Sequence, residues 1–180
     1  MGSLPYKNSA GLKIIPEKEE NYREVEALMD KAFGKNRRQK TAYLLRPENG
    51  FVRSLAYVAL DGRSRLQGSL RFWPVRLAER PKLHCLLLGP LAVEAIHRGK
   101  GVARALITRG LEDATRKSWQ LCLVISEESL YKRFGFTPAE ILGFHLPAYE
   151  RPGKLHVKEL EPGCLDADFL GSFVLPVEQF

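Results

Sequence analysis

The stretch that decides the fold is residues 97–107, His-Arg-Gly-Lys-Gly-Val-Ala-Arg-Ala-Leu-Ile. It follows the apolar, strand-like run 86–93 and is a glycine-rich turn that opens into an amphipathic helical pattern. The first backbone N–H groups of a helix have no intrahelical partner, and the helix dipole adds partial positive charge there. Gly99 and Gly101 allow the backbone to approach a bulky phosphate closely. The stretch therefore predicts an anion site, unless its glycines serve only the geometry of the turn.

The charge and the spacing of this turn narrow the choice of ligand. Arg98, Lys100 and Arg104 add formal positive charge, so a cofactor with a pyrophosphate group is the first expectation. The spacing fits neither G-x-G-x-x-G nor G-x-x-x-x-G-K-[ST], which disfavours a dinucleotide-dependent oxidoreductase and a P-loop protein. It does fit [Q/R]-x-x-G-x-[G/A], carried by Arg98, Gly101 and Ala103.

A second motif, Y-x-x-x-G-F from Tyr131 to Phe136, follows the next strand-like run. In this order, with one helix and one strand between them, the two motifs resemble those of the Gcn5-related N-acetyltransferase (GNAT) superfamily. Residues 83–139 are similar to the bacterial predicted N-acetyltransferases of the YhbS-like group. The resemblance implies a GNAT fold and acetyl-CoA, or another acyl-CoA, as cosubstrate without a metal. It also implies direct attack by an amine of a small molecule or protein. A catalytically silent acyl-CoA-binding module is the alternative.

The resemblance also assigns roles to individual residues. Backbone groups of the strand would hold the pantetheine arm and supply an oxyanion donor, and the glycine turn would hold the pyrophosphate. The cofactor-binding residues are then Leu91, Ala92, Val93, Arg98, Gly99, Lys100, Gly101, Val102, Ala103 and Arg104. Tyr131 occupies the position of the tyrosine that protonates the leaving thiolate, although it could instead only pack near the cofactor. A phenol is a hydrogen-bond donor at neutral pH.

The proton acceptor for the amine is less well defined. Glu94 follows the central strand and is the catalytic candidate, where many relatives carry Asp-Pro and this chain has Glu-Ala. Glu127, Glu128 and His84 also lie near strand ends, and a chain of water molecules could replace a dedicated base.

The prediction of residues that bind the acceptor rests on residue types alone. Basic residues that could hold an acidic acceptor, or merely solvate a helix, are Arg37, Arg38 and Lys40. Phe72 and Trp73 could line a pocket or belong to the core.

Composition limits the remaining alternatives. The chain has 180 residues, 44% hydrophobic and 27% charged, which predicts one globular domain over 11–180 after a loose leader over 1–10. The net charge of +7 suits the phosphates of an acyl-CoA, and a nucleic-acid-binding protein is the second explanation. No stretch has the length of a membrane span or the pattern of a secretory signal. Three widely spaced cysteines predict buried, inert thiols rather than a disulfide framework, so a reducing cytoplasm is the expected location.

Hydrophobic periodicity predicts an α/β (α+β) fold with a mixed central sheet, in the order β-α-α-β-β-β-α-β-α-β-β. Asp61-Gly62 predicts a tight hairpin turn, and Gly89-Pro90 a kink or bulge in the central strand. The tail 169–180 could pair with a second copy, giving a homodimer. Strands are expected at 12–15, 51–60, 66–75, 83–93, 121–125, 139–144 and 155–160, and helices at 19–33, 38–45, after the glycine turn and at 129–134.

Overall fold

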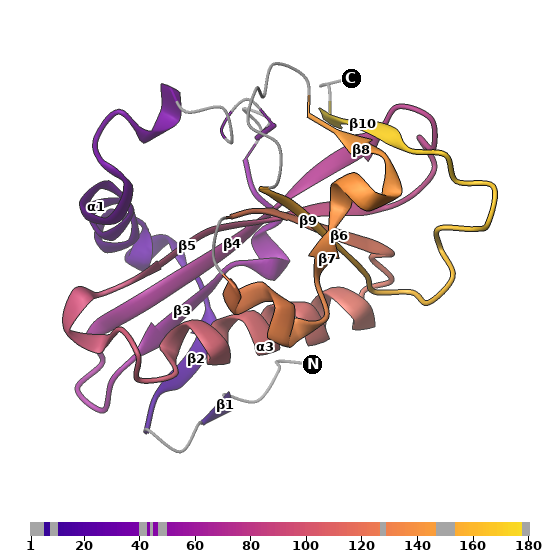
Figure 1. The fold of residues 1–180 in the computed structure, drawn as a ribbon. Coiled ribbons are helices and arrows are strands. Elements are labelled where there is room, and N and C mark those ends of the chain that lie inside the picture. Colours follow the sequence, from indigo (N-terminus) through magenta and orange to yellow (C-terminus); the bar gives the residue numbers. More distant parts are fainter. Residues whose placement is uncertain are drawn as a thin grey trace. The chain divides into compact units, whose positions relative to one another are not determined.

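The computed structural model describes residues 6–7, 11–39, 43, 45–46, 50–126, 129–146 and 154–177. Its α-helices and strands are shown in Figure 1. They are β1 (Tyr6–Lys7), β2 (Lys13–Pro16), α1 (Tyr22–Phe33), β3 (Tyr57–Leu60), β4 (Leu66–Leu77), β5 (Cys85–Val93), α3 (Val102–Arg116), β6 (Leu121–Ile125), β7 (Thr137–Pro138), β8 (Phe144–His145), β9 (Leu155–Glu159) and β10 (Ser172–Pro176). Short 3-10 helices cover Glu19–Asn21, Arg37–Gln39, Arg53–Leu55, Ala95–His97, Ser129–Phe134 and Ala139–Leu142.

The chain forms two compact units, each made of three separate segments. The first contains Met1–Arg38, Val52–Phe72 and Gly89–Asp113, and the second Gln39–Phe51, Trp73–Leu88 and Ala114–Phe180. Strands β4 and β5 and helix α3 each contribute residues to both units. The two units therefore do not correspond to two consecutive pieces of the sequence.

In the first unit, antiparallel strands are hydrogen-bonded in the order β1-β2-β3-β4, and β5 is the neighbour of β4. Helix α3 packs on one face of β4: a Cβ placed on Gly110 would lie 2.5 Å from Cε2 of Phe72. Helix α1 covers the other face, where Arg71 of β4 donates a hydrogen bond to Glu26 at 2.7 Å. The apolar side of α1 supplies Val25, Leu28 and Met29, which pack with Val58 and Ala92.

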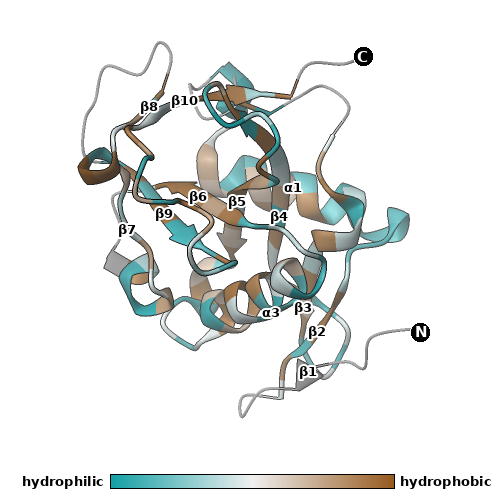
Figure 2. Ribbon diagram, turned by 90° about the vertical axis from the view of Figure 1, so that its right-hand side faces the viewer, coloured by the Kyte–Doolittle hydropathy of each residue, from teal (hydrophilic) through white to brown (hydrophobic). Residues whose placement is uncertain are grey.

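In the second unit, Cys85–Leu88 of β5 pair in parallel with Leu121–Val124 of β6. Strand β6 pairs antiparallel with β9, which also pairs with β7. As predicted, β6 is buried on both faces over its first four residues, and it is a brown, apolar strand in Figure 2. Its neighbours complete a core that includes Leu77, Leu87 and Phe144.

Three expected elements differ from the structure. The strand expected at 51–60 begins only at Tyr57, because Arg53–Leu55 form a 3-10 helix. The hairpin turn is longer than the predicted two residues: Asp61 N–H donates to Arg65 O, and Ser64 takes the positive φ of 60°. The expected strand at 139–144 is instead the 3-10 helix Ala139–Leu142, which Gly143 ends with φ 74°.

The tail contains a strand that the sequence did not predict. Residues Val174–Pro176 of β10 pair antiparallel with Val75–Leu77 of β4, and β10 also pairs with β8. Residues 172–176 thus pair within the chain, and a homodimer through the tail 169–180 stays a prediction. Half of the residues of the helix expected at 38–45, and all of the leader except Tyr6 and Lys7, lie outside the described residues; Arg38 and Gln39 belong to the 3-10 helix Arg37–Gln39.

Candidate functional site

The glycine turn between β5 and α3 is held by its own backbone. His97 N–H donates to Glu94 O at 2.8 Å, and Lys100 N–H donates to His97 O at 3.3 Å. Gly99 and Gly101 have φ angles of 74° and 82°, which strongly favour glycine.

Helix α3 begins at the end of this turn. Its first backbone hydrogen bond runs from Ala105 N–H to Gly101 O at 3.0 Å. The N–H groups of Val102, Ala103 and Arg104 precede that bond. They are the groups that a helix start offers to an anion.

The charge around this turn is positive and unneutralised. Arg98, Lys100 and Arg104 are exposed, and none of them has an ion pair with another residue of the described part of the chain. A Cβ on Gly99 or Gly101 would meet no atom within 4 Å, so the space beside the backbone is open. The turn thus combines positive charge, free helix-start N–H groups and room for a ligand, as a phosphate site requires.

The pairing of strand β5 with β6 ends before the strand reaches the glycine turn. The ladder between β5 and β6 ends at Leu88 opposite Val124. Gly89 then takes a φ of 117°, and the Gly89–Pro90 peptide bond is cis. Among the residues that follow, Leu91 and Val93 are half-buried and Ala92 is buried.

Tyr131 lies in the 3-10 helix Ser129–Phe134, and only 6% of it is exposed. Its ring packs edge-on against Phe136 with the centroids 5.8 Å apart, and Phe136 N–H donates to Tyr131 O at 3.3 Å. Gly135 has a φ of 82°, and a Cβ there would lie 2.9 Å from Nζ of Lys158. The Y-x-x-x-G-F motif is therefore a closed turn whose positive φ at Gly135 favours glycine, and a Cβ there would require the end of the Lys158 side chain to move.

Glu94, the catalytic candidate, is held by an ion pair. Its Oε2 accepts a hydrogen bond from Nζ of Lys31 in α1 at 2.7 Å. Its backbone N–H donates to Gln67 O of β4 at 2.9 Å. His84 is exposed and its ring lies 6.2 Å from that of Trp119. Glu127 and Glu128 lie outside the described residues.

Two of the basic residues after α1 pair with acidic side chains of α1. Arg37 is buried and donates hydrogen bonds to Glu26 and, at 2.7 Å, to Asp30. Arg38 is exposed and pairs with Glu26 at 3.2 Å. Arg37 is thus neutralised inside the protein rather than presented to a ligand, and Lys40 lies outside the described residues.

Glu26 is the centre of a charged network that sequence reasoning missed. Besides Arg37 and Arg38, it pairs with Arg71, which also binds the fully buried carboxylate of Glu17 at 2.5 Å. Burial opposes ionisation of Glu26, but hydrogen bonds from Arg71 and Arg37 outweigh it and hold its pKa below the usual value. No local sequence pattern predicts these contacts, because Arg71 is distant in the sequence from Glu17 and Glu26.

Phe72 and Trp73 have different environments. Phe72 is completely buried against Gly110, so it belongs to the core. Trp73 is half-buried, and its ring packs edge-on with Phe51 at 5.8 Å and near the guanidinium of Arg46.

The three cysteines are free thiols. Burial raises the pKa of Cys85 to about 12 and that of Cys164 to about 11, and it raises the pKa of the fully buried Cys122 as well. Thiols with such values are poor nucleophiles near neutral pH, in agreement with the predicted inert role. Cys164, however, is only half-buried.

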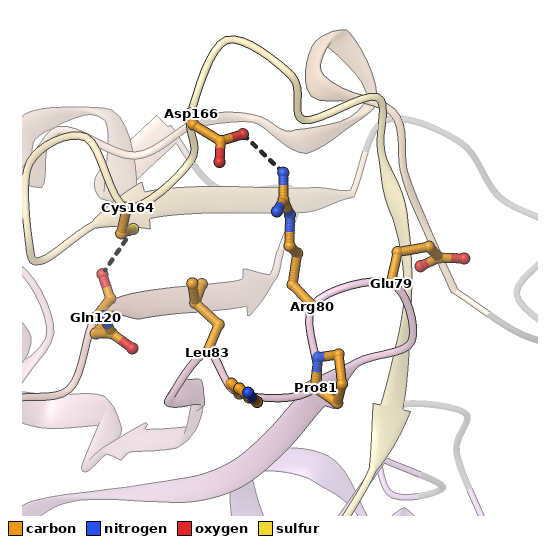
Figure 3. Close-up of a pocket in the computed structure, with 8 residues that line it drawn as sticks. Glu79, Arg80, Pro81, Leu83, Gln120, Cys164 and Asp166 are labelled. Carbon is orange, nitrogen blue, oxygen red and sulfur yellow. Dashed lines mark hydrogen bonds and ion pairs between the residues drawn. The ribbon is translucent and has the colours of Figure 1, made fainter.

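Cys164 lines a pocket of about 410 Å³ in the second unit. Figure 3 shows its lining residues, with the ion pair between Arg80 and Asp166 at 2.7 Å and the contact of Cys164 Sγ with Gln120 O at 3.3 Å. None of the predicted catalytic or cofactor-binding residues lines it. Within the described ranges, no cluster of three or more His, Cys, Asp or Glu side chains could bind a metal, and no helix is long and apolar enough to cross a membrane.

Comparison with known proteins places these features in context. Residues 13–139 match the family model described as an acetyltransferase (GNAT) domain. Over 112 residues the chain is 32% identical to the uncharacterized N-acetyltransferase YhbS of Escherichia coli K12, an alignment that covers 62% of this chain and 65% of that protein.

Solved structures show the same similarity. A crystal structure of E. coli YhbS in complex with CoA superposes with a TM-score of 0.80 and 25% identity, over 96% of this chain and 93% of that one. A GNAT acetyltransferase from Brucella melitensis in complex with acetyl-CoA has a TM-score of 0.65 and 21% identity, over 85% and 90%.

Proposed function

Because this chain belongs to the GNAT acetyltransferase family, we propose that it is an acyl-CoA-dependent N-acyltransferase. It transfers acetyl from acetyl-CoA to an amine of a small molecule or protein by direct attack. The observation that carries the proposal is the open turn before α3, where Arg98, Lys100 and Arg104 have no ion-pair partner in the described structure. The E. coli and Brucella structures, which contain CoA and acetyl-CoA, support the choice of ligand.

Each part of the cofactor has a matching part of the chain. The pyrophosphate binds the backbone N–H groups at the start of α3, with Arg98, Lys100 and Arg104 supplying charge. The pantetheine arm pairs with backbone groups of Leu91–Val93, which follow the end of the ladder between β5 and β6. A backbone N–H in this segment then donates to the oxyanion that forms on the thioester carbonyl.

The reaction forms one bond and breaks one bond. The amine nitrogen attacks the thioester carbon, the new C–N bond forms, and the C–S bond breaks. The proton lost by the amine passes to Glu94, directly or through water, and Lys31 holds that carboxylate in place. The phenol of Tyr131 gives its proton to the departing CoA thiolate. In the second candidate mechanism, water takes the amine proton without a dedicated base.

A thermal-shift titration with acetyl-CoA tests the proposal first, with NAD and a short DNA duplex as controls. Saturation at about 100 times Kd stabilises a fold by about 2.7 kcal/mol. We expect acetyl-CoA alone to raise the melting temperature and amine-dependent release of CoA to follow. Binding without turnover for any amine identifies a silent acyl-CoA-binding module. Stabilisation by DNA alone contradicts the proposal.

A further inference from the structure

A pocket of the second unit is lined, over the described part of the chain, by residues that have no role in the proposed acetyl transfer. Its volume is about 410 Å³, within the range of small-molecule sites, about 300–1,000 Å³. Three stretches of the second unit form its walls: the loop between β4 and β5, the residue before β6 and the segment after β9. They contribute Glu79, Arg80, Pro81, Lys82 and Leu83, then Gln120, and then Cys164 and Asp166 (Figure 3).

Hydrogen bonds hold the walls of this pocket in place. The Gln120 side chain accepts a hydrogen bond from His84 N–H at 3.1 Å and donates one to Glu161 at 2.8 Å. The backbone O of Gln120 accepts a hydrogen bond from the Cys164 thiol at 3.3 Å. Because these contacts lie within the protein, ligand binding need not create the pocket.

Glu79 belongs to the wall of the pocket, but its carboxylate contacts β10. It accepts hydrogen bonds from the hydroxyl of Ser172 and from Phe173 N–H. Figure 3 shows this carboxylate turned away from Leu83 and from the Arg80 side chain. The negative charge of Glu79 therefore does not point into the pocket.

The remaining charged side chains give the pocket a net positive charge. Arg80 and Asp166 form an ion pair, with 2.7 Å between Nη2 and Oδ1, in which both side chains are partly exposed. Arg80 donates through Nη2 alone, so its Nε and Nη1 groups have no hydrogen-bond partner in the described structure. Lys82 is exposed, and its ammonium has no ion pair with any described residue. Two cations with unused N–H groups thus line the pocket beside one carboxylate.

These donors favour an anionic ligand, and the rest of the wall favours an apolar body. A guanidinium and an ammonium bind a carboxylate through charge-assisted hydrogen bonds. Pro81 and Leu83 add apolar surface, and the single uncompensated positive charge matches a monocarboxylate better than a phosphate dianion. We propose that the pocket binds a small organic carboxylate, whose charged group binds Arg80 and Lys82 and whose apolar part contacts Leu83. This site goes beyond the proposed acetyl transfer and does not depend on it.

Protection of Cys164 tests the proposal, because this thiol lines the pocket while Cys85 and Cys122 are fully buried. Iodoacetamide, which is uncharged and does not compete for the cations, alkylates the full chain at a fixed pH, and mass spectrometry follows the Cys164 peptide. The probes are benzoate, phenylacetate and hexanoate, each matched with its uncharged amide, and inorganic phosphate. We expect at least one of the carboxylates to slow alkylation saturably, and we expect no protection by the amides or by phosphate.

Calorimetric titration of variants with the protecting carboxylate locates the contact. Lys82→Met and Arg80→Gln each remove one charge-assisted interaction and should raise the Kd about tenfold. Asp166→Asn removes the competing carboxylate and should lower the Kd several-fold. Lys35→Met, which removes an exposed charge after α1, is the matched control and should leave the Kd unchanged.

Several results would overturn the carboxylate site. Protection by none of the carboxylates, or equal protection by the matched amides, contradicts it directly. Protection by phosphate alone assigns the pocket to another class of anion. Full affinity in both Lys82→Met and Arg80→Gln places the ligand elsewhere on the chain. Weaker binding in Asp166→Asn than in the native protein shows that the pocket holds a positive group of the ligand instead.

Discussion

Lys31 of α1 and Glu94, the residue that follows β5, form an ion pair with 2.7 Å between Nζ and Oε2. Both residues belong to the first unit. The Glu94 side chain is 28% exposed and that of Lys31 is 63% exposed, so the carboxylate keeps access to solvent while the ammonium restricts its position. Glu94 also starts the turn that leads to Gly99 and Gly101. Helix α1 is thereby connected to the proposed cofactor loop through one carboxylate.

The first prediction concerns Glu94 as the proton acceptor. Glu94→Gln should lower kcat by about 10²–10⁴, the contribution of a positioned general base. The Kd of acetyl-CoA should stay the same, because the amide keeps the side-chain volume. Steady-state kinetics and a binding titration measure the two effects.

Lys31→Met is the companion variant, because it removes the partner and keeps the carboxylate. We expect a smaller loss of kcat that Lys31→Arg restores. A kcat of Glu94→Gln within about fivefold of the native value, far below the contribution of a general base, would assign the proton transfer to water.

The second prediction concerns the cofactor loop. Gly101→Glu should abolish stabilisation by acetyl-CoA, because it puts a negative side chain into the space beside the free N–H groups of α3. Gly101 has a φ of 82°, so Gly101→Ala is needed to measure the backbone strain separately. Gly62→Glu, an equal charge change in an exposed loop, should leave the thermal shift intact. A normal shift in Gly101→Glu would remove this loop from the cofactor site.

The third prediction concerns Tyr131 as the acid. Tyr131→Phe removes only the hydroxyl and keeps the edge-on contact with Phe136. We expect kcat to fall about 10²-fold or more, with little change in acetyl-CoA affinity. Tyr57→Phe is the matched control, since that buried hydroxyl donates to Asp113 at 2.6 Å and should affect stability rather than turnover. Equal turnover in Tyr131→Phe and the native enzyme would leave Tyr131 with a packing role alone.

The glycine turn between β5 and α3 could be predicted from the sequence because its determinants are local. Gly99 and Gly101 need positive φ angles, and an apolar run before them and a helical pattern after them define the flanking elements. The buried strand β6 could be predicted for a similar reason, since its first four residues are apolar and covered on both faces.

The segment 139–144 was mistaken for a strand because a distant contact decides its conformation. Gly143 ends the 3-10 helix, and a Cβ there would lie 2.9 Å from Cα of Gly171. No pattern within residues 139–144 predicts that Gly171 lies so close to Gly143. The same limitation applies to Arg46 and Trp73: the Arg46 Cζ atom lies 5.7 Å from the Trp73 ring centroid although the two residues are 27 positions apart in the sequence.

The fourth prediction concerns stability in acid. The pKa of Glu26 is held below its ordinary value of 4.5 by hydrogen bonds from Arg71 and Arg37, despite the opposing effect of burial. A lowered pKa in the folded state contributes stability that is present above pH 4.5 and lost as the pH falls through the folded-state value. Urea unfolding between pH 7 and pH 3 should therefore show a smaller acid loss in Glu26→Gln than in the native protein.

Glu20→Gln is the control for this experiment, because Glu20 is exposed and its Oε1 atom lies 3.8 Å from Nζ of Lys18. It should follow the native pH dependence. An acid loss in Glu26→Gln as steep as that of the native protein would show that other carboxylates determine the acid transition.

The fifth prediction concerns Gly110, which lies inside α3 and contacts β4. Helix propensity alone favours alanine at an interior position by about 1 kcal/mol. A Cβ on Gly110 would, however, lie 2.5 and 2.8 Å from ring atoms of Phe72, which is completely buried. Because overpacking of a core costs about 1–3 kcal/mol, Gly110→Ala should lower the free energy of unfolding despite the better propensity.

A double-mutant cycle with Phe72→Leu identifies the cause: the penalty of Gly110→Ala should shrink or reverse when the ring is absent. If Gly110→Ala stabilises the native background, α3 has room to move away from β4 and the close packing of Phe72 does not determine its position.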